Sequence, residues 1–175
     1  MQLVILDEAQ KERYAKDILA LLTLSDNDFL PPLSARTSTT QTALQPLKSN
    51  DDGITFYHKE MMQQEILGAL DGDVLLGFVS YKHNFSNACI DEKYFPNVYL
   101  STLVLHPSAR GKRLTAKFYD YLFNEVFPTR NIFTRTWSTN GSHLHILQSF
   151  DFKEWKRIPN DRGEGIDTVY YALLR

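Results

Sequence analysis

Residues 97–115 read NVYLSTLVLHPSARGKRLT and place an apolar run, a proline and a basic stretch in that order. The run is apolar at both alternating sets of positions, which predicts a central strand covered on both faces. Pro107 cannot donate a hydrogen bond to a sheet ladder, so the strand should end there. Leu114, Phe118 and Leu122 recur at helical spacing. The stretch therefore predicts a strand, a basic loop and a helix.

Apolar spacing outward from this stretch predicts the other elements. Two β-type runs on either side of Asp71-Gly72 predict an antiparallel hairpin, with strands at residues 65–70 and 74–81. The remaining predicted strands are residues 3–6, 132–137, 152–158 and 168–174, and the predicted helices are residues 12–22, 56–64 and 140–148. These elements predict an α+β fold in a single domain over residues 1–175.

Composition restricts the class of protein. The chain has 175 residues, of which 43% are hydrophobic and 23% charged, as is typical of a folded globular domain. It has no apolar run long enough for a membrane helix and no basic leader at its start. A net charge of -2 argues against nucleic-acid and membrane partners. The only cysteine, Cys89, cannot form an internal disulfide, so we expect a buried, inert thiol in a cytoplasmic protein.

The basic loop is the first candidate site. Three cations surround Gly111, and unpaired N–H groups at the start of the following helix suit a phosphate group. Gly111 would let the backbone approach such a ligand closely. The alternative interpretation is a solvated basic turn, because charge clusters are common on protein surfaces.

This loop resembles the pyrophosphate loop of the GNAT superfamily of acetyl-CoA-dependent N-acyltransferases. In that family a Leu-x-Val strand end and a proline precede the pattern Arg/Gln-x-x-Gly-x-Gly/Ala. Here Arg113 stands where Gly is usual, and Thr115 stands where Gly or Ala is usual. The resemblance implies acetyl-CoA as cosubstrate, and the matching positions are Leu103, Val104, Leu105, Arg110, Gly111, Lys112, Arg113, Leu114 and Thr115.

A second motif downstream resembles the same family, whose pattern is Asn-x-x-Ala, then Tyr, then Gly-Phe. Asn140 and Phe152 keep this spacing, and the resemblance adds Asn140 to the cofactor-binding residues. His143, Leu147 and Asp151 depart from the pattern. In many relatives the tyrosine is the proposed proton donor to the departing thiolate, and Leu147 cannot act as one.

The resemblance implies a mixed, mostly antiparallel sheet flanked by helices, with a parallel strand pair at the cofactor site. It also implies direct attack of an amine on the thioester. The acceptor can be a protein amino terminus, a lysine, a polyamine, an aminoglycoside or another small amine. The oligomeric state also stays open, as a monomer or a homodimer. A catalytically silent coenzyme A-binding or interaction module of the same fold is the alternative, because Leu147 replaces tyrosine and the strand has no glutamate. The polar groups available for catalysis are Tyr99, Ser101, Thr102 and His145, with Asp91 and Glu92 able to act through water.

Two further expectations concern histidines and acids. His143 and His145 are two residues apart and diverge on a helix, so we expect no metal site. Either could relay protons, and two surface histidines are the alternative. Residues 25–52 contain Pro31-Pro32 and many Ser and Thr, which predicts a mobile segment near an opening. Within it, Asp26 and Asp28 would meet a cationic acceptor or simply face solvent.

Overall fold

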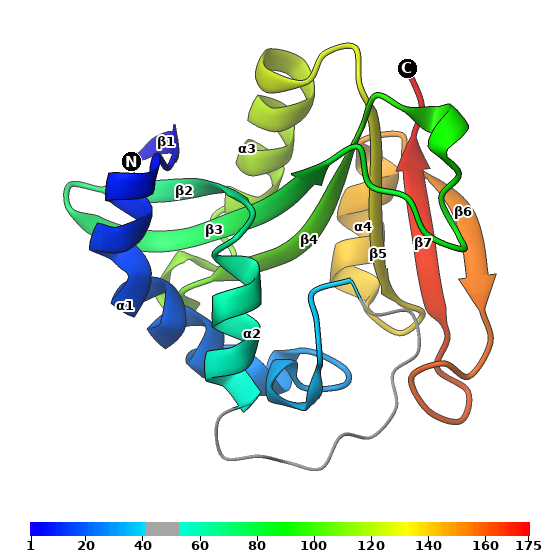
Figure 1. Cartoon of the computed structure of the whole chain (residues 1–175), viewed down its shortest axis with the longest axis horizontal. Coiled ribbons are helices and arrows are strands. Elements are labelled where there is room, and N and C mark those ends of the chain that lie inside the picture. The colour runs from blue at the N-terminus through cyan, green and yellow to red at the C-terminus, as the bar shows by residue number, and fades with distance from the viewer. Residues whose placement is uncertain (41–52) are drawn as a thin grey trace. The chain divides into compact units, whose positions relative to one another are not determined.

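The computed structural model describes residues 1–40 and 53–175 and contains a seven-stranded sheet flanked by helices (Figure 1). The strand order is β1-β2-β3-β4-β5-β7-β6. β4 and β5 are parallel, whereas β1 with β2, β5 with β7 and β6 with β7 are antiparallel. The α+β fold with one parallel pair is therefore confirmed.

The strands agree with the sequence to within a few residues at each end. Pro107 ends β4 as predicted, and the hairpin turns at Gly72, whose φ of 58° suits glycine. The strands are β1 (Gln2–Ile5), β2 (Glu65–Asp71), β3 (Val74–His83), β4 (Asn97–Leu105), β5 (Asn131–Trp137), β6 (Lys153–Ile158) and β7 (Thr168–Leu173).

The helices are α1 (Glu8–Leu24), α2 (Gly53–Met61), α3 (Leu114–Asp120) and α4 (Gly141–Ser149). α1 begins four residues before the predicted start because Asp7 caps it, accepting from Gln10 N while the Gln10 side chain accepts from Asp7 N. α2 covers residues 53–61 instead of 56–64. The helix predicted from Leu114 onward widens into a π-helix at Tyr121–Val126.

The chain divides into two compact units, one of residues 1–80 and 102–114 and one of residues 81–101 and 115–175. The core of the first unit packs α1 and α2 against β2 and β3, with Ile18, Tyr57 and Phe78 fully buried. A core cluster of the second unit joins Tyr99, Phe133 and Tyr170, and Trp155 packs against it. Each unit thus has an apolar core of its own.

β6 lies at one end of the strand order and differs from the other strands in character. It carries Lys153, Glu154, Lys156 and Arg157, and its pairing with β7 shifts register between Glu154 and Lys156. Such a shift is a β-bulge, which bends and twists the strand.

Candidate functional site

The basic loop between β4 and α3 has a backbone suited to an anion. Gly111 and Arg113 both have left-handed backbone conformations, with φ of 72° and 58°. None of the N–H groups of Gly111, Lys112 and Arg113 donates a hydrogen bond within the described part of the chain. Successive free N–H groups in a turn of this kind form an anion-binding concavity. The side chains of Lys112 and Arg113 are exposed and add positive charge.

Arg110, also predicted to contact the cofactor, is held by its own unit. Its Nη2 pairs with Asp28 Oδ2 at 2.6 Å and lies 3.4 Å from Ser25 Oγ, and its Nε donates to Leu105 O at 3.4 Å. Asp28 is exposed to solvent and at the same time pairs with the guanidinium of Arg110. The sequence could not reveal this pair, whose members lie 82 residues apart.

The segment predicted to be mobile forms two short 3-10 helices in its described part, Asp26–Asp28 and Leu33–Ala35. Residues 41–52 of this segment lie outside the described residues, and its mobility stays a prediction. Asp26 accepts from Ser34 N at 2.7 Å and from Ser34 Oγ at 2.8 Å. Arg36 is buried, donates twice to Pro31 O and stacks on the Phe29 ring. These contacts fold the segment onto itself because a buried guanidinium needs acceptors.

The catalytic candidates on β4 differ in exposure. Tyr99 is buried and stacks on Phe85, and Thr102 is buried with its Oγ1 2.7 Å from Tyr57 Oη. Ser101 is half-buried. Tyr99 and Thr102 thus have packing roles in the core, whatever else they do.

The parallel pairing of β4 with β5 is short. It runs from Asn97 opposite Asn131 to Leu100 opposite Thr134, although β4 continues to Leu105. Three predicted cofactor-binding positions follow the last β4 residue that pairs with β5. They are Leu103, Val104 and Leu105.

The start of α4 contains the second motif. Asn140 caps the helix, with Oδ1 3.4 Å from His143 N, and its Nδ2 donates to Thr136 Oγ1 at 3.0 Å. Leu147 is fully buried, and His145 is exposed. The side chain of Asn140 therefore ties α4 to β5, and its predicted role in cofactor binding would come in addition to this structural one.

His143 is not a plain surface histidine, which corrects one of the expectations. It is half-buried, and its Nε2 lies 2.6 Å from Tyr119 Oη on α3. Burial lowers the pKa of His143 to about 4 and raises the pKa of Tyr119 above its usual range. Sequence reasoning missed Tyr119 because an aromatic residue on the apolar face of a helix reads as core.

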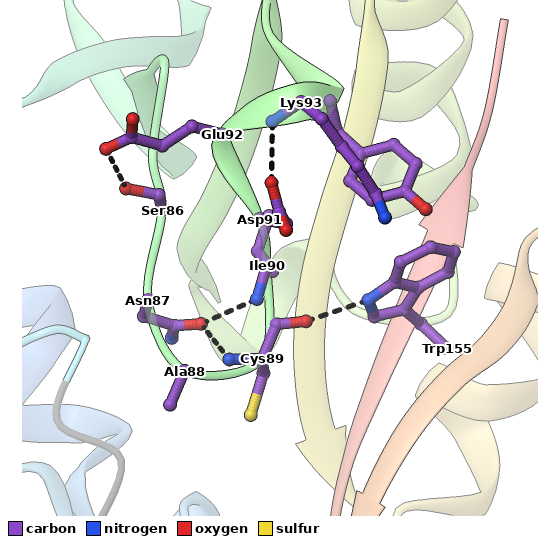
Figure 2. A pocket seen from close by; sticks show the side chains of 10 residues that line it. Ser86, Asn87, Ala88, Cys89, Ile90, Asp91, Glu92, Lys93 and Trp155 are labelled. Atoms are coloured by element: carbon purple, nitrogen blue, oxygen red, sulfur yellow. Dashed lines mark hydrogen bonds between the residues drawn. The ribbon is translucent and has the colours of Figure 1, made fainter.

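A pocket of about 570 Å³ lies in the segment between β3 and β4, for which the sequence predicted no structure (Figure 2). Asn87 Oδ1 accepts from Cys89 N and Ile90 N, and Trp155 Nε1 donates to Cys89 O at 2.9 Å. Cys89 is only half-buried, whereas the sequence predicted a buried thiol. The acids Asp91 and Glu92 belong to this pocket, where Asp91 Oδ1 accepts from Lys93 N.

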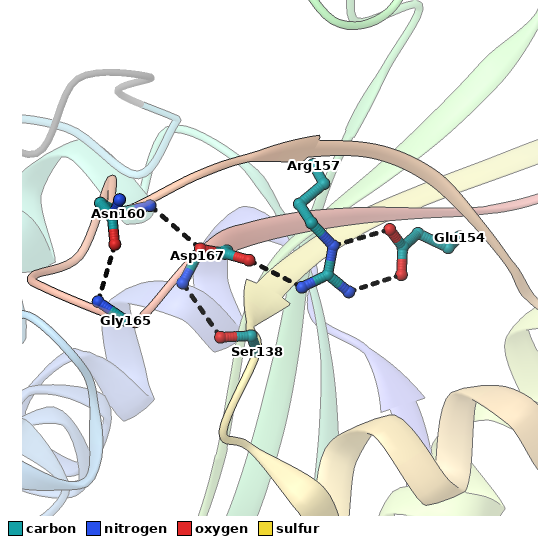
Figure 3. A network of polar contacts seen from close by, with 6 residues as sticks. All are labelled: Ser138, Glu154, Arg157, Asn160, Gly165 and Asp167. Carbon is teal, nitrogen blue, oxygen red and sulfur yellow. Dashed lines mark hydrogen bonds and ion pairs between the residues drawn. The ribbon is translucent and has the colours of Figure 1, made fainter.

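The loop between β6 and β7 is fixed by a network around Asp167 (Figure 3). Asp167 accepts from Arg157 Nη1 at 2.8 Å and from Asn160 N at 3.0 Å, and its own N–H donates to Ser138 Oγ. The hydrogen bond from Arg157 lowers the pKa of the Asp167 carboxyl. The loop is thereby attached to Ser138, which follows β5 directly.

Among residues 1–40 and 53–175, no three His, Cys, Asp or Glu side chains are grouped so that they could hold a metal ion. No helix in this part of the chain has the length and apolar character needed to cross a bilayer.

Comparison with solved structures shows that the chain has the fold of the GNAT acetyltransferases. Aminoglycoside 6′-acetyltransferase type Ii matches with a TM-score of 0.68 and 18% identity over 99% of this chain and 97% of that one. The protein yncA from Salmonella typhimurium, solved with its cofactor acetyl-CoA, matches with a TM-score of 0.61 and 17% identity over 99% of this chain and 92% of that one. A GNAT-family acetyltransferase from Bacillus cereus matches with a TM-score of 0.63 and 15% identity over 99% of this chain and 96% of that one. No protein-family model and no curated protein matches the chain.

Proposed function

We propose that residues 1–175 form one cytoplasmic N-acyltransferase domain that binds acetyl-CoA at the basic loop and acetylates an amine. The observation that carries this proposal is the loop itself, with the consecutive free N–H groups of Gly111, Lys112 and Arg113 beside two exposed cations. A pyrophosphate offers oxygens and negative charge to both features. The GNAT fold adds support, because yncA, which has this fold, was solved with acetyl-CoA.

The proposed reaction is direct transfer. The amine nitrogen, once neutral, attacks the thioester carbonyl carbon, and the C–S bond breaks after a tetrahedral intermediate. Coenzyme A leaves as a thiolate that takes up one proton, and the amine loses one proton to solvent. Since an alkylammonium has a pKa near ~10, deprotonation requires a base or a water chain. Ser101 and His145 are the more accessible of the four catalytic candidates.

The acceptor is a small-molecule or peptide amine. The fold is shared with an enzyme named for aminoglycosides, which makes polyvalent amines a first class to test. A catalytically silent coenzyme A-binding module is the second candidate, and the buried Leu147 favours it, since no hydroxyl is present at that position.

Thiol release from acetyl-CoA, measured against a panel of amines, separates these two functions. Turnover with any amine supports the transferase. Binding of acetyl-CoA without turnover supports the silent module, and no binding contradicts both. Binding itself is followed by thermal melting, where ligand at ~100 times its Kd should add ~2.7 kcal/mol to stability.

Two matched glycine variants locate the cofactor. Gly111 and Gly72 both have positive φ, and a Cβ at either residue would have no atom within 4 Å. Gly111→Val and Gly72→Val therefore carry a similar backbone strain. Only Gly111→Val should obstruct the phosphate, so calorimetry should show a larger loss of acetyl-CoA affinity for it. Equal losses, or none, would place the anion elsewhere.

A further inference from the structure

Gly77 lies inside β3, where a glycine is unfavourable. Glycine loses more backbone entropy on folding than any other residue, and it offers a sheet no side chain to pack. Gly77 is buried, and its φ is not positive, so the local backbone would accept an alanine. The reason for a glycine at this position must therefore come from a neighbouring part of the molecule.

The end of β4 is this neighbour. A Cβ on Gly77 would lie 2.7 Å from Val104 O, 2.7 Å from Leu105 Cδ2 and 3.2 Å from Leu105 Cα. Contacts of 2.7 Å are too short for a real Cβ atom, so part of the structure would have to shift. Because Val104 O belongs to the backbone, a methyl group at residue 77 would displace the strand itself.

The end of β4 supports the basic loop through hydrogen bonds. His106 N donates to Leu76 O at 2.8 Å, one residue before Gly77. Arg110 Nε donates to Leu105 O at 3.4 Å. All five of these residues belong to the first unit. A shift of the end of β4 should therefore be passed on to the basic loop.

We propose that Gly77 is a positioning residue for the basic loop. Its missing side chain lets the end of β4 lie close against β3, and this close packing sets the place of the N–H groups of Gly111, Lys112 and Arg113. Gly77 makes no contact with the ligand in this proposal. The inference rests on the proposed function, since it gives Gly77 a part in acetyl-CoA binding at that loop.

Gly68 in β2 provides a matched control. It is also a buried strand glycine of the first unit. A Cβ on Gly68 would meet Leu75 Cδ1 at 3.1 Å and Leu6 Cδ2 at 3.4 Å. Both atoms are the ends of flexible side chains, which can move by a few tenths of an ångström. Gly68→Ala should therefore crowd the core and leave the basic loop in place.

Amide NMR tests the positioning role without any ligand. Gly77→Ala should shift the backbone amide signals of Gly111, Lys112 and Arg113, whereas Gly68→Ala should leave these signals unchanged. A loss of stability alone would not move the signals of the folded protein, so this readout separates a positioning role from a purely structural one. Unchanged signals in Gly77→Ala, or equal shifts in both variants, would overturn the inference.

Calorimetry then tests the consequence for binding. Gly77→Ala should weaken the affinity for acetyl-CoA about tenfold, the loss of about one hydrogen bond to a charged group, and Gly68→Ala should change it little. Circular dichroism confirms that each variant is folded. Equal affinities of the two variants would overturn the inference, whereas a wild type that binds no acetyl-CoA overturns the proposed function.

A second comparison serves if Gly77→Ala alone does not fold. Leu105→Ala removes one of the two closest contacts and gives the new methyl group some room, while Val104 O stays in place. Gly77→Ala added to Leu105→Ala should therefore still weaken acetyl-CoA binding relative to Leu105→Ala. A double variant that binds as tightly as Leu105→Ala would contradict the positioning role.

Discussion

Acid should destabilise this protein through His143. Burial lowers the pKa of His143 from 6.5 to about 4 in the folded chain. Below pH ~6.5 the unfolded chain binds a proton that the folded chain does not, so stability is lost as the pH falls toward ~4. At 1.36 kcal/mol per pH unit, a shift of this size amounts to at most ~3 kcal/mol. That is a large share of the free energy of unfolding of a folded domain, which is typically about 5–15 kcal/mol.

Urea denaturation of wild type and His143→Gln across this pH range measures the effect. The variant should be less stable than wild type near neutral pH, because Tyr119 loses its partner, and the difference should shrink as the pH falls. Burial also lowers the pKa of His58, but this contribution is common to both proteins and cancels in the comparison. A stability difference that stays constant between pH ~6.5 and ~4.5 would refute the reasoning.

Two further predictions concern the first unit. Tyr57→Phe leaves the buried Thr102 hydroxyl without its partner, so the free energy of unfolding should fall by ~1–3 kcal/mol, and Thr102→Val in the same chain should recover part of it; a double variant no more stable than Tyr57→Phe would contradict this. Asp28→Asn should raise acetyl-CoA affinity in calorimetry, because it frees Arg110 and removes a negative charge that repels the phosphates. Asp26→Asn should leave that affinity unchanged. Equal effects of both would show that Arg110 takes no part.

Two departures from the family pattern show what the sequence can reveal about the backbone. Arg113 and Asp151 both stand where the resemblance has glycine, and both have positive φ, of 58° and 63°. Side chains at such angles are strained but tolerated. The backbone conformations that glycine favours are thus present even though the residue has changed, which local sequence comparison could indicate.

Contacts between distant segments could not be predicted in this way. Strand and helix positions follow from apolar spacing, which is a local property. The pairs Arg110 with Asp28 and Tyr119 with His143 join residues 82 and 24 positions apart. Arg110, Asp28 and His143 were visible as polar groups, whereas Tyr119 looked like a core aromatic residue. The partner of each depends on how the elements pack. The candidate site was therefore predictable at its loop and not at its side-chain contacts.

The bulge and the four charged side chains of β6 have a consequence for assembly. An outermost strand with a regular, apolar edge invites the addition of a strand from a second molecule. On β6, the register shift between Glu154 and Lys156 interrupts the edge, and placing Lys153 or Arg157 beside a second copy would bring like charges together. A continuous sheet across two copies is therefore disfavoured at this edge, and if the chain dimerises, the interface should lie on another surface.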